Sequence, residues 1–266
     1  MTQHDQPAAI VGWDEPEGLN PRGTVIVLPG RGEQPAVYER FGRRISADAY
    51  RVRAVASPAE DPALTEKQVR SLLDGPKPVV LAGSDTGALF AAALVASGRL
   101  PEVAALVLAG LPTGPAAGAA AGQGGGGDPA DGTGAWHAEL AARTACPAHR
   151  GKLAGDILRR GALYEPVPAG WIEQADLKAV TVPVLGLHGA ADPVSALAAA
   201  RAKYAAAPHA ELVSIADGRH DAFNDITHRT AAATIVLFLE RLRNGAGLAP
   251  IAVREPLGHP VGARES

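Results

Sequence analysis

The sequence predicts an α/β protein built on a mostly parallel, doubly wound sheet. Short β-branched or apolar runs alternate with longer helical runs along most of the chain, which is the pattern of βαβ units. A chain of 266 residues is also long enough to bury the core of one such domain. Strands are expected at residues 24–28, 50–54, 79–81, 103–109, 182–187 and 210–216, and helices at 36–47, 64–73, 88–97, 195–206 and 222–243.

The individual elements are assigned from local patterns. Residues 8–13 form one short apolar run, which predicts an edge strand followed by a loop of acids and prolines. The first helix carries Val37, Phe41 and Ile45 at intervals of four, so one of its faces is apolar. The helix at 88–97 is nearly all apolar, which is typical of a helix buried against a sheet.

The alternation stops after the strand at 103–109. Residues 112–134 are mainly Gly, Ala and Pro, and we expect a mobile loop because this segment cannot bury enough apolar surface to offset its ordering entropy. Residues 135–163 predict two helical pieces broken near Pro147, and a further short helix is expected at 169–177. The sequence thus predicts a core of residues 1–111 and 180–243. A loop and helical lid at 112–179 are inserted before the strand at 182–187, and a tail follows at 244–266.

Composition narrows the class of function. The net charge is −3 with a pI near 6.2 and no basic block, so the sequence predicts neither nucleic-acid binding nor stable membrane association. Cys146 is the single cysteine, which excludes an internal disulfide and is typical of a reducing cytoplasm. The N-terminus lacks the blocks of a signal peptide, and no apolar run approaches about 20 residues. We expect a cytoplasmic protein that acts on a small molecule, with a homodimer contact through the tail left open.

The most informative stretch joins the strand at 79–81 to the helix at 88–97. Its letters are GSDTG, with Gly83 and Gly87 on either side of a three-residue apex. A sharp strand-to-helix turn strains the backbone of its middle residue, and the residues two positions away must be small for strand and helix to approach. The middle residue is Asp85, while Ser84 is one residue out of register. Asp85 is therefore the candidate for the exposed reactive side chain.

Two later loops supply an acid and an imidazole. Asp192 follows the strand that ends at Leu187, and His220 follows the strand that ends near residue 216. The order nucleophile, acid, histidine is that of the α/β-hydrolases. The segments VLPGRGEQPAVYERFGRRISADAYRV, VPVLGLHGAADPV and SIADGRH resemble the first, acid and histidine loops of monoacylglycerol-lipase-like and lysophospholipase-like members of that superfamily.

The sequence departs from this resemblance at two positions. Those relatives usually carry His where this chain has Pro29, and Ser where it has Asp85. An Asp at the apex resembles epoxide hydrolases and haloalkane dehalogenases, although these usually place Trp where Thr86 stands. A carboxylate attacks ester carbonyls poorly because the product is a mixed anhydride, but it can attack an epoxide or halide carbon.

The favoured hypothesis is therefore a cofactor-independent hydrolase with an Asp85–His220–Asp192 triad and no metal. Asp85 would form an alkyl-enzyme ester, and His220, oriented by Asp192, would activate the water that cleaves it. The expected oxyanion donors are the backbone N–H groups of Arg31 and Thr86. Candidate substrate contacts in the lid are Trp136, Tyr164 and Trp171; Tyr164 is also a candidate acid for an epoxide oxygen.

Other interpretations stay open at this point. Asp85 and His220 could exchange protons in a lyase, cyclase or isomerase, the chain could be an esterase, or it could be a ligand-binding protein on a retired hydrolase fold. His188, near Asp192, is expected to serve packing or hydrogen bonding. The Arg31 side chain either clamps an anionic substrate or is a solvated or salt-bridged arginine.

Overall fold

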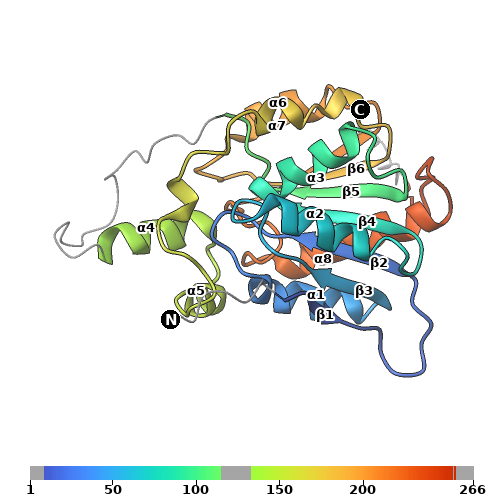
Figure 1. The fold of residues 1–266 in the computed structure, drawn as a ribbon, viewed down its shortest axis with the longest axis horizontal. Helices are drawn as coiled ribbons and strands as arrows, with labels where there is room; N and C mark the ends of the chain where they lie inside the picture. Colours follow the sequence, from blue (N-terminus) through green and yellow to red (C-terminus); the bar gives the residue numbers. More distant parts are fainter. Residues whose placement is uncertain (1–8, 115–132, 254, 256–266) are drawn as a thin grey trace, which may run out of the picture.

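A seven-stranded sheet forms the centre of the computed structural model, which describes residues 9–114, 133–253 and 255 (Figure 1). The strand order is β1-β3-β2-β4-β5-β6-β7, and only the edge strand β1 runs antiparallel to its neighbour. The strands are β1 (Val11–Trp13), β2 (Gly23–Leu28), β3 (Tyr50–Ala54), β4 (Val79–Ser84), β5 (Val103–Ala109), β6 (Val184–Gly189) and β7 (Ala210–Ile215). The predicted fold class is confirmed.

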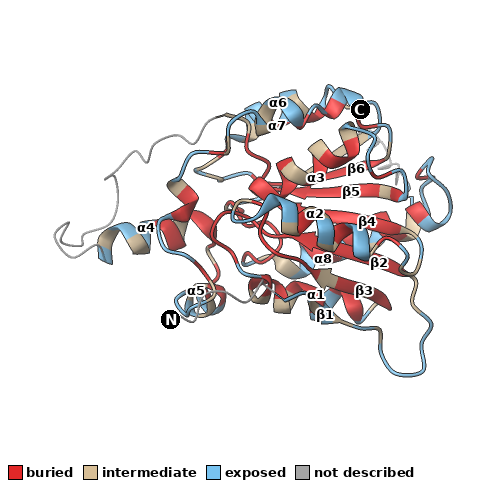
Figure 2. Ribbon diagram, viewed as in Figure 1, coloured by how far each residue is buried: buried red, intermediate tan, exposed pale blue. Residues whose placement is uncertain are grey.

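Helices cover both faces of this sheet. Within β2, Val25 and Val27 join the core cluster under α1 (Glu39–Ser46) and α8 (His228–Arg243), whereas Ile26 and Leu28 face the cluster on the other side. That second cluster packs against α2 (Pro62–Ser71), α3 (Thr86–Ala96) and α7 (Leu197–Tyr204). Figure 2 shows β2, β4 and β6 buried along their whole length, whereas the edge strands β1 and β7 are partly exposed and the exposed helix residues lie on the outer sides. A strand buried on both faces reads as a continuous apolar run rather than an alternating one, as β2 and β4 do.

The direction in which the chain winds along the sheet changes between β2 and β4. After β2 the chain crosses to β3 on one side, and after β3 it returns to β4 on the other side of β2. In open α/β sheets, ligands bind at the carboxyl ends of strands where the winding direction changes. The residues that follow β2 and β4 include Arg31 and Asp85, so this topology brings the first loop and the predicted reactive turn together.

The segment between β5 and β6 contains short helices, as predicted. They are α4 (Thr133–Arg143), α5 (Pro147–Leu153), α6 (Trp171–Gln174) and the 3-10 turns η2 (Ala162–Tyr164) and η3 (Leu177–Ala179). Pro147 opens α5, a position where its missing N–H costs nothing. In Figure 1, α4 and α5 lie beyond one end of the sheet, whereas α6 lies beside α3. A covering role for this segment stays a prediction, and residues 115–132 of the expected mobile loop lie outside the described residues.

Most predicted helix ends lie within about three residues of those in the structure, but two are wrong by more. The sequence predicts that the second helical piece reaches residue 163, but it ends at Leu153, after which Leu158 pairs with Glu33 in an isolated β-bridge. The helix expected from residue 222 begins at His228. Residues 222–227 form turns, in which the Asp225 carboxylate accepts the N–H of Ile226 at 2.8 Å and, from outside the segment, those of Ala145 and Arg219 at 2.6 and 2.7 Å. An Asp side chain that bonds the backbone N–H beside it competes with helix formation.

The ends of the chain add little to the architecture. Of the predicted tail, residues 244–253 and 255 are described and contain neither helix nor strand; the rest lies outside the described residues. Within the described residues, no helix is both long and apolar enough to cross a membrane.

Candidate active site

Asp85 occupies the strained apex between β4 and α3. Its φ of 51° and ψ of −123° lie outside the regions that residues with a side chain ordinarily adopt. Such a conformation costs about 1–3 kcal/mol and is found mostly at functional sites. The neighbouring glycines permit it: a Cβ on Gly83 would lie 2.5 Å from the Ala88 backbone, and one on Gly87 would lie 2.1 Å from the Leu28 carbonyl oxygen. The packing argument made from the sequence is confirmed.

Gly87→Ala is expected to destabilise the fold by about 3 kcal/mol or more, because the added methyl group meets backbone atoms that cannot move aside. Gly151→Ala is the matched control. Gly151 lies inside α5 with nothing within 4 Å of a built Cβ, so this change should be neutral or stabilising by up to about 1 kcal/mol. Chemical denaturation checks both values. Equal effects of the two substitutions would contradict the packing described for the turn.

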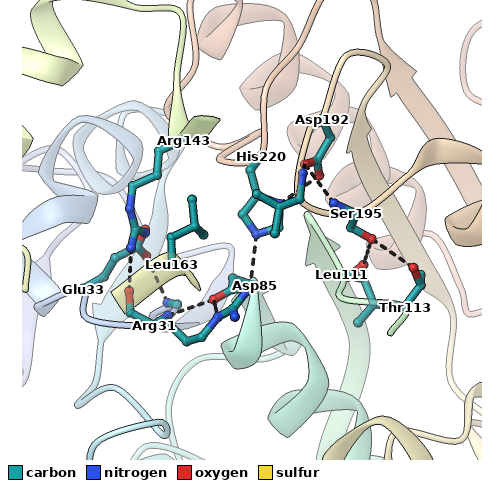
Figure 3. A network of polar contacts seen from close by, with 12 residues as sticks. Arg31, Glu33, Asp85, Leu111, Thr113, Arg143, Leu163, Asp192, Ser195 and His220 are labelled. Carbon is teal, nitrogen blue, oxygen red and sulfur yellow. Dashed lines mark hydrogen bonds and ion pairs between the residues drawn. The ribbon is translucent and has the colours of Figure 1, made fainter. Parts of the chain in front are cut away.

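The structure brings the three predicted triad residues together (Figure 3). His220 Nε2 lies 3.2 Å from Asp85 Oδ1, and His220 Nδ1 lies 2.8 Å from Asp192 Oδ2. The second Asp192 oxygen accepts the backbone N–H groups of Val194 and Ser195, at 2.8 and 3.1 Å. Asp192 is therefore held in place by its own loop, and it orients the imidazole toward Asp85.

The Arg31 side chain forms a bidentate ion pair with Asp85. Arg31 Nε donates to Asp85 Oδ2 and a terminal nitrogen donates to Oδ1, both at 2.8 Å, while the Arg31 backbone N–H donates to Oδ2 at 2.9 Å. The other terminal nitrogen donates to the Glu165 carbonyl at 2.6 Å. Together with His220, Asp85 faces four donors, which matches the roughly four lone-pair sites of a carboxylate. Of the two alternatives left open for Arg31, the structure has the salt bridge.

These contacts fix the charge states of the cluster. Burial alone would raise the pKa of Asp85, but the Arg31 guanidinium and the bond from His220 hold it well below its ordinary value. Burial alone would lower the pKa of His220, yet the Asp192 and Asp85 carboxylates raise it to about 10. His220 is thus an imidazolium at neutral pH that donates from both nitrogens. The side chains of Arg31, Asp85, His220 and Asp192 form a buried, charge-balanced set.

The raised pKa of His220 predicts a pH dependence of folding stability. A group whose pKa is higher in the folded state stabilises fully below its unfolded value, near 6.5, and loses this contribution as the pH rises toward 10. The free energy of unfolding should therefore fall by about 3 kcal/mol more in the parent than in His220→Gln between about pH 6.5 and 9.5. Denaturant titrations at the two pH values measure this difference. Parallel pH profiles of parent and variant would contradict the assignment.

A second buried network connects α4 to the first loop. Arg143 donates to Glu33 at 2.9 Å and to the Arg31 carbonyl at 3.0 Å (Figure 3). It also donates to Glu139 at 2.8 Å. Glu139 in turn accepts the backbone N–H of Leu163 at 3.2 Å. Sequence reasoning did not find these residues, and a single arginine or glutamate in a helix gives no signal of burial. The network fixes the backbone that presents Arg31 to Asp85.

The predicted oxyanion donors differ in their present contacts. The Arg31 N–H is already bonded to Asp85 Oδ2. Thr86 is the first residue of α3, so its N–H has no partner within the helix. Both groups lie at the apex, but their role toward a reacting substrate stays a prediction. The prediction of an exposed Asp85 side chain is wrong: Asp85 and His220 are only 1% and 2% exposed, and the Asp85 carboxylate is paired with the likewise buried Arg31.

The three aromatic candidates do not share one location. The Trp136 ring stacks under the Arg160 guanidinium, 5.0 Å from the ring centre, and packs against the α1–α8 cluster. Trp171 contacts Phe90, with ring centres 5.1 Å apart, on the opposite face of the sheet. Half-buried Tyr164 lies in η2, where burial and Glu139 raise the pKa of its hydroxyl. Substrate contacts for these residues stay predictions.

His188 supports the acid loop, as expected for a hydrogen-bonding residue. Its Nε2 lies 2.7 Å from the Ser195 carbonyl oxygen and 3.4 Å from Asp192 Oδ2, and the side chain is fully buried. Burial lowers the pKa of His188, so it is neutral beside the charged His220. No group of three or more His, Cys, Asp or Glu side chains in the described part of the chain is arranged to hold a metal ion.

Comparisons with known proteins identify the architecture. The sequence matches no family model and no curated protein. Among solved structures, it is similar to monoglyceride lipase from Saccharomyces cerevisiae, with a TM-score of 0.68, 16% identity, and coverage of 87% of this chain and 91% of that one. It is also similar to monoacylglycerol lipase from Paleococcus ferrophilus, with a TM-score of 0.65, 17% identity, and coverage of 87% of this chain and 97% of that one. An esterase from Rhodococcus sp. ECU1013 has a TM-score of 0.60 and 21% identity, with coverage of 87% of this chain and 94% of that one. With the strained turn and the order of its loops, this likeness shows that the chain has the α/β-hydrolase fold.

Proposed function

We propose that the protein is a cofactor-independent hydrolase in which Asp85 attacks an electrophilic sp³ carbon of a small, largely apolar molecule. The carbon would belong to an epoxide or bear a halide. The observation that carries the proposal is the position of Asp85 at the strained apex, with His220 3.2 Å away and Asp192 bonded behind the imidazole. The backbone strain has no evident structural use and is of the kind that persists at reactive residues.

The first step requires one oxygen of Asp85 to lose a donor. Oδ1 is held by an Arg31 terminal nitrogen and by His220, whereas Oδ2 is held by the Arg31 backbone and Nε. When the Arg31 terminal nitrogen withdraws, Oδ1 attacks the carbon, and the electron pair of the broken bond leaves with the halide or the epoxide oxygen. An epoxide oxygen also needs a proton. The imidazolium of His220 and the Tyr164 hydroxyl are the two candidate donors.

The second step uses the change in charge that the first one makes. Esterification removes the negative charge of Asp85, which is one of two carboxylates that raise the pKa of His220. The pKa of His220 then falls, and the imidazolium gives its proton to the epoxide oxygen or, after halide loss, to solvent. The neutral imidazole can then take a proton from the water that attacks the carbonyl carbon of the ester. The negative charge that develops on Oδ2 would face the Arg31 N–H and guanidinium, with Thr86 N–H beside them. On collapse the imidazolium protonates the departing alkoxide, which leaves as the alcohol, and the new carboxyl group returns a proton to His220, which restores the Asp85–Arg31 pair.

A single turnover in ¹⁸O-water tests this proposal. Epoxides and alkyl halides are screened first, and the peptide that contains Asp85 is then weighed after one turnover. Hydrolysis of an ester on Asp85 leaves one heavy oxygen in the carboxyl group. Turnover with no label in that peptide would exclude the covalent route and favour direct proton transfer by Asp85 and His220.

The four-donor arrangement favours a second candidate, a ligand-binding protein without hydrolytic activity. A carboxylate whose lone pairs are all engaged is a structural ion-pair partner rather than a nucleophile. In that case no substrate in the screen is turned over. His220→Gln, which removes the base needed for ester hydrolysis, would likewise accumulate no adduct by intact mass.

A further inference from the structure

A basic groove lies between α1, α5 and the start of α8, and it shares no residue with the Asp85 cluster. The hollow has a volume of about 680 Å³. This falls within the range of small-molecule sites, about 300–1,000 Å³. Its lining consists of Glu39, Arg40, Arg43, Arg44, Ala47, Lys152, His228 and Arg229. Five cationic side chains therefore face one carboxylate, in a protein whose net charge is −3.

The single carboxylate in the groove is already engaged. Glu39 Oε1 pairs with Arg43 at 3.0 Å, and Glu39 Oε2 pairs with Lys152 at 2.6 Å. This arrangement neutralises part of the charge of Arg43 and Lys152. The groove lining offers no other acidic side chain with which Arg40, Arg44 and Arg229 could pair.

Those three guanidinium groups have no carboxylate partner within the residues that the structure describes. Arg40 donates to two neutral acceptors, Cys146 Sγ at 3.3 Å and the Asn224 carbonyl oxygen, and its Nε is buried without a partner. Arg44 and Arg229 are exposed and form no hydrogen bond or ion pair with any described side chain. Like charges gathered around one hollow repel one another, and a bound anion would relieve this repulsion.

Two further features add positive potential at this place. Helix α8 begins at His228 with no side-chain cap on its first turn, so the positive end of its dipole lies at the groove wall. Burial and the charges of Arg40 and Arg229 also lower the pKa of His228, while the Asp225 carbonyl opposes this shift. The neighbouring imidazole thus responds to the same unneutralised cations.

We propose that the basic groove binds the phosphate group of a small phosphorylated molecule. Guanidinium groups match the oxygens of phosphate in paired hydrogen bonds, and those of Arg44 and Arg229 are exposed and unpaired at the groove. The concave shape suits a small molecule, and the side-chain stems of the arginines, together with Ala47, offer an apolar wall for its organic part. This site is independent of the reaction at Asp85.

Isothermal titration of the full chain with pyrophosphate at constant ionic strength tests the site. Arg44→Gln combined with Arg229→Gln should weaken pyrophosphate binding roughly tenfold or more, because it removes both exposed, unpaired cations. Arg201→Gln, an exposed arginine on α7, is the matched control and should leave the Kd unchanged. Pyrophosphate that binds no more tightly than chloride, or equal losses in control and double variant, would overturn the proposal.

Two additional measurements locate the anion and distinguish its source. Inorganic phosphate should shift the His228 ring resonance, assigned with His228→Gln, and the shift should be absent in the double variant. Sedimentation with vesicles of phosphatidylcholine and phosphatidic acid should show no binding. Vesicle binding that the double variant loses would assign the groove to a lipid surface and overturn the small-molecule proposal.

Discussion

Asp85→Asn is expected to lower kcat/KM by at least about 10³-fold on any substrate that the parent turns over. An amide is not a nucleophile, and loss of a member of a catalytic triad commonly costs this much or more. The substitution also removes the charge that pairs with Arg31 and with His220. Single-turnover kinetics measure the effect.

Asp217→Asn is the control for that substitution. Asp217 is exposed, precedes His220 in the same loop and has a φ of 55°, a conformation that Asn tolerates well. The activity of the Asp217→Asn variant should equal that of the parent protein. Intact mass must show that the amide introduced by Asp85→Asn has not deamidated back to a carboxylate. Near-parent activity in an undeamidated Asp85→Asn protein would rule out the nucleophile.

Arg31→Met is expected to destabilise the protein by about 3–5 kcal/mol, because it leaves the buried Asp85 carboxylate without the cation that contacts both its oxygens. Chemical denaturation at neutral pH measures this loss. Adding Asp85→Asn to Arg31→Met should recover part of it, since the uncompensated charge is then absent.

Arg99→Met serves as the reference for the ion-pair argument. Arg99 pairs with Glu66 at 3.0 Å on the surface, where such pairs contribute about 0–1 kcal/mol. If Arg31→Met lowers the free energy of unfolding no more than Arg99→Met does, the buried Arg31–Asp85 pair does not stabilise the fold as described. Stability losses of Arg31→Met and Asp85→Asn that simply add in the double variant would contradict the pairing as well.

The features that sequence predicts well are those fixed by local pattern. The strand expected at 103–109 matches β5 in full, and the turn around Asp85 is recognisable because Gly83 and Gly87 are a local steric requirement. Asp192 and His220 could be found because each follows a strand, and parallel strands end at the same edge of a sheet. Their positions in the sequence, each just after a strand, were therefore enough to predict that these residues lie close together.

The features that could not be predicted depend on partners distant in sequence. Arg31 and Asp85 are separated by 54 residues, and their pairing follows from β2 and β4 being neighbours. Helix α8 begins only at residue 228, after a turn in which the Asp225 side chain accepts the backbone N–H of the distant Ala145. No periodicity marks such a carboxylate as buried. The charge states at the site therefore required the structure, because they depend on which side chains face one another.

An NMR titration of the His220 ring tests the central claim, that this imidazole lies between two ionised carboxylates. With ¹⁵N-labelled histidine, both ring nitrogens should remain protonated through neutral pH, with a pKa near the expected value of about 10. In Asp85→Asn the pKa should be lower, because one carboxylate is gone. A neutral His220 ring at pH 7, in parent and variant alike, would contradict the charge arrangement on which the proposed reaction rests.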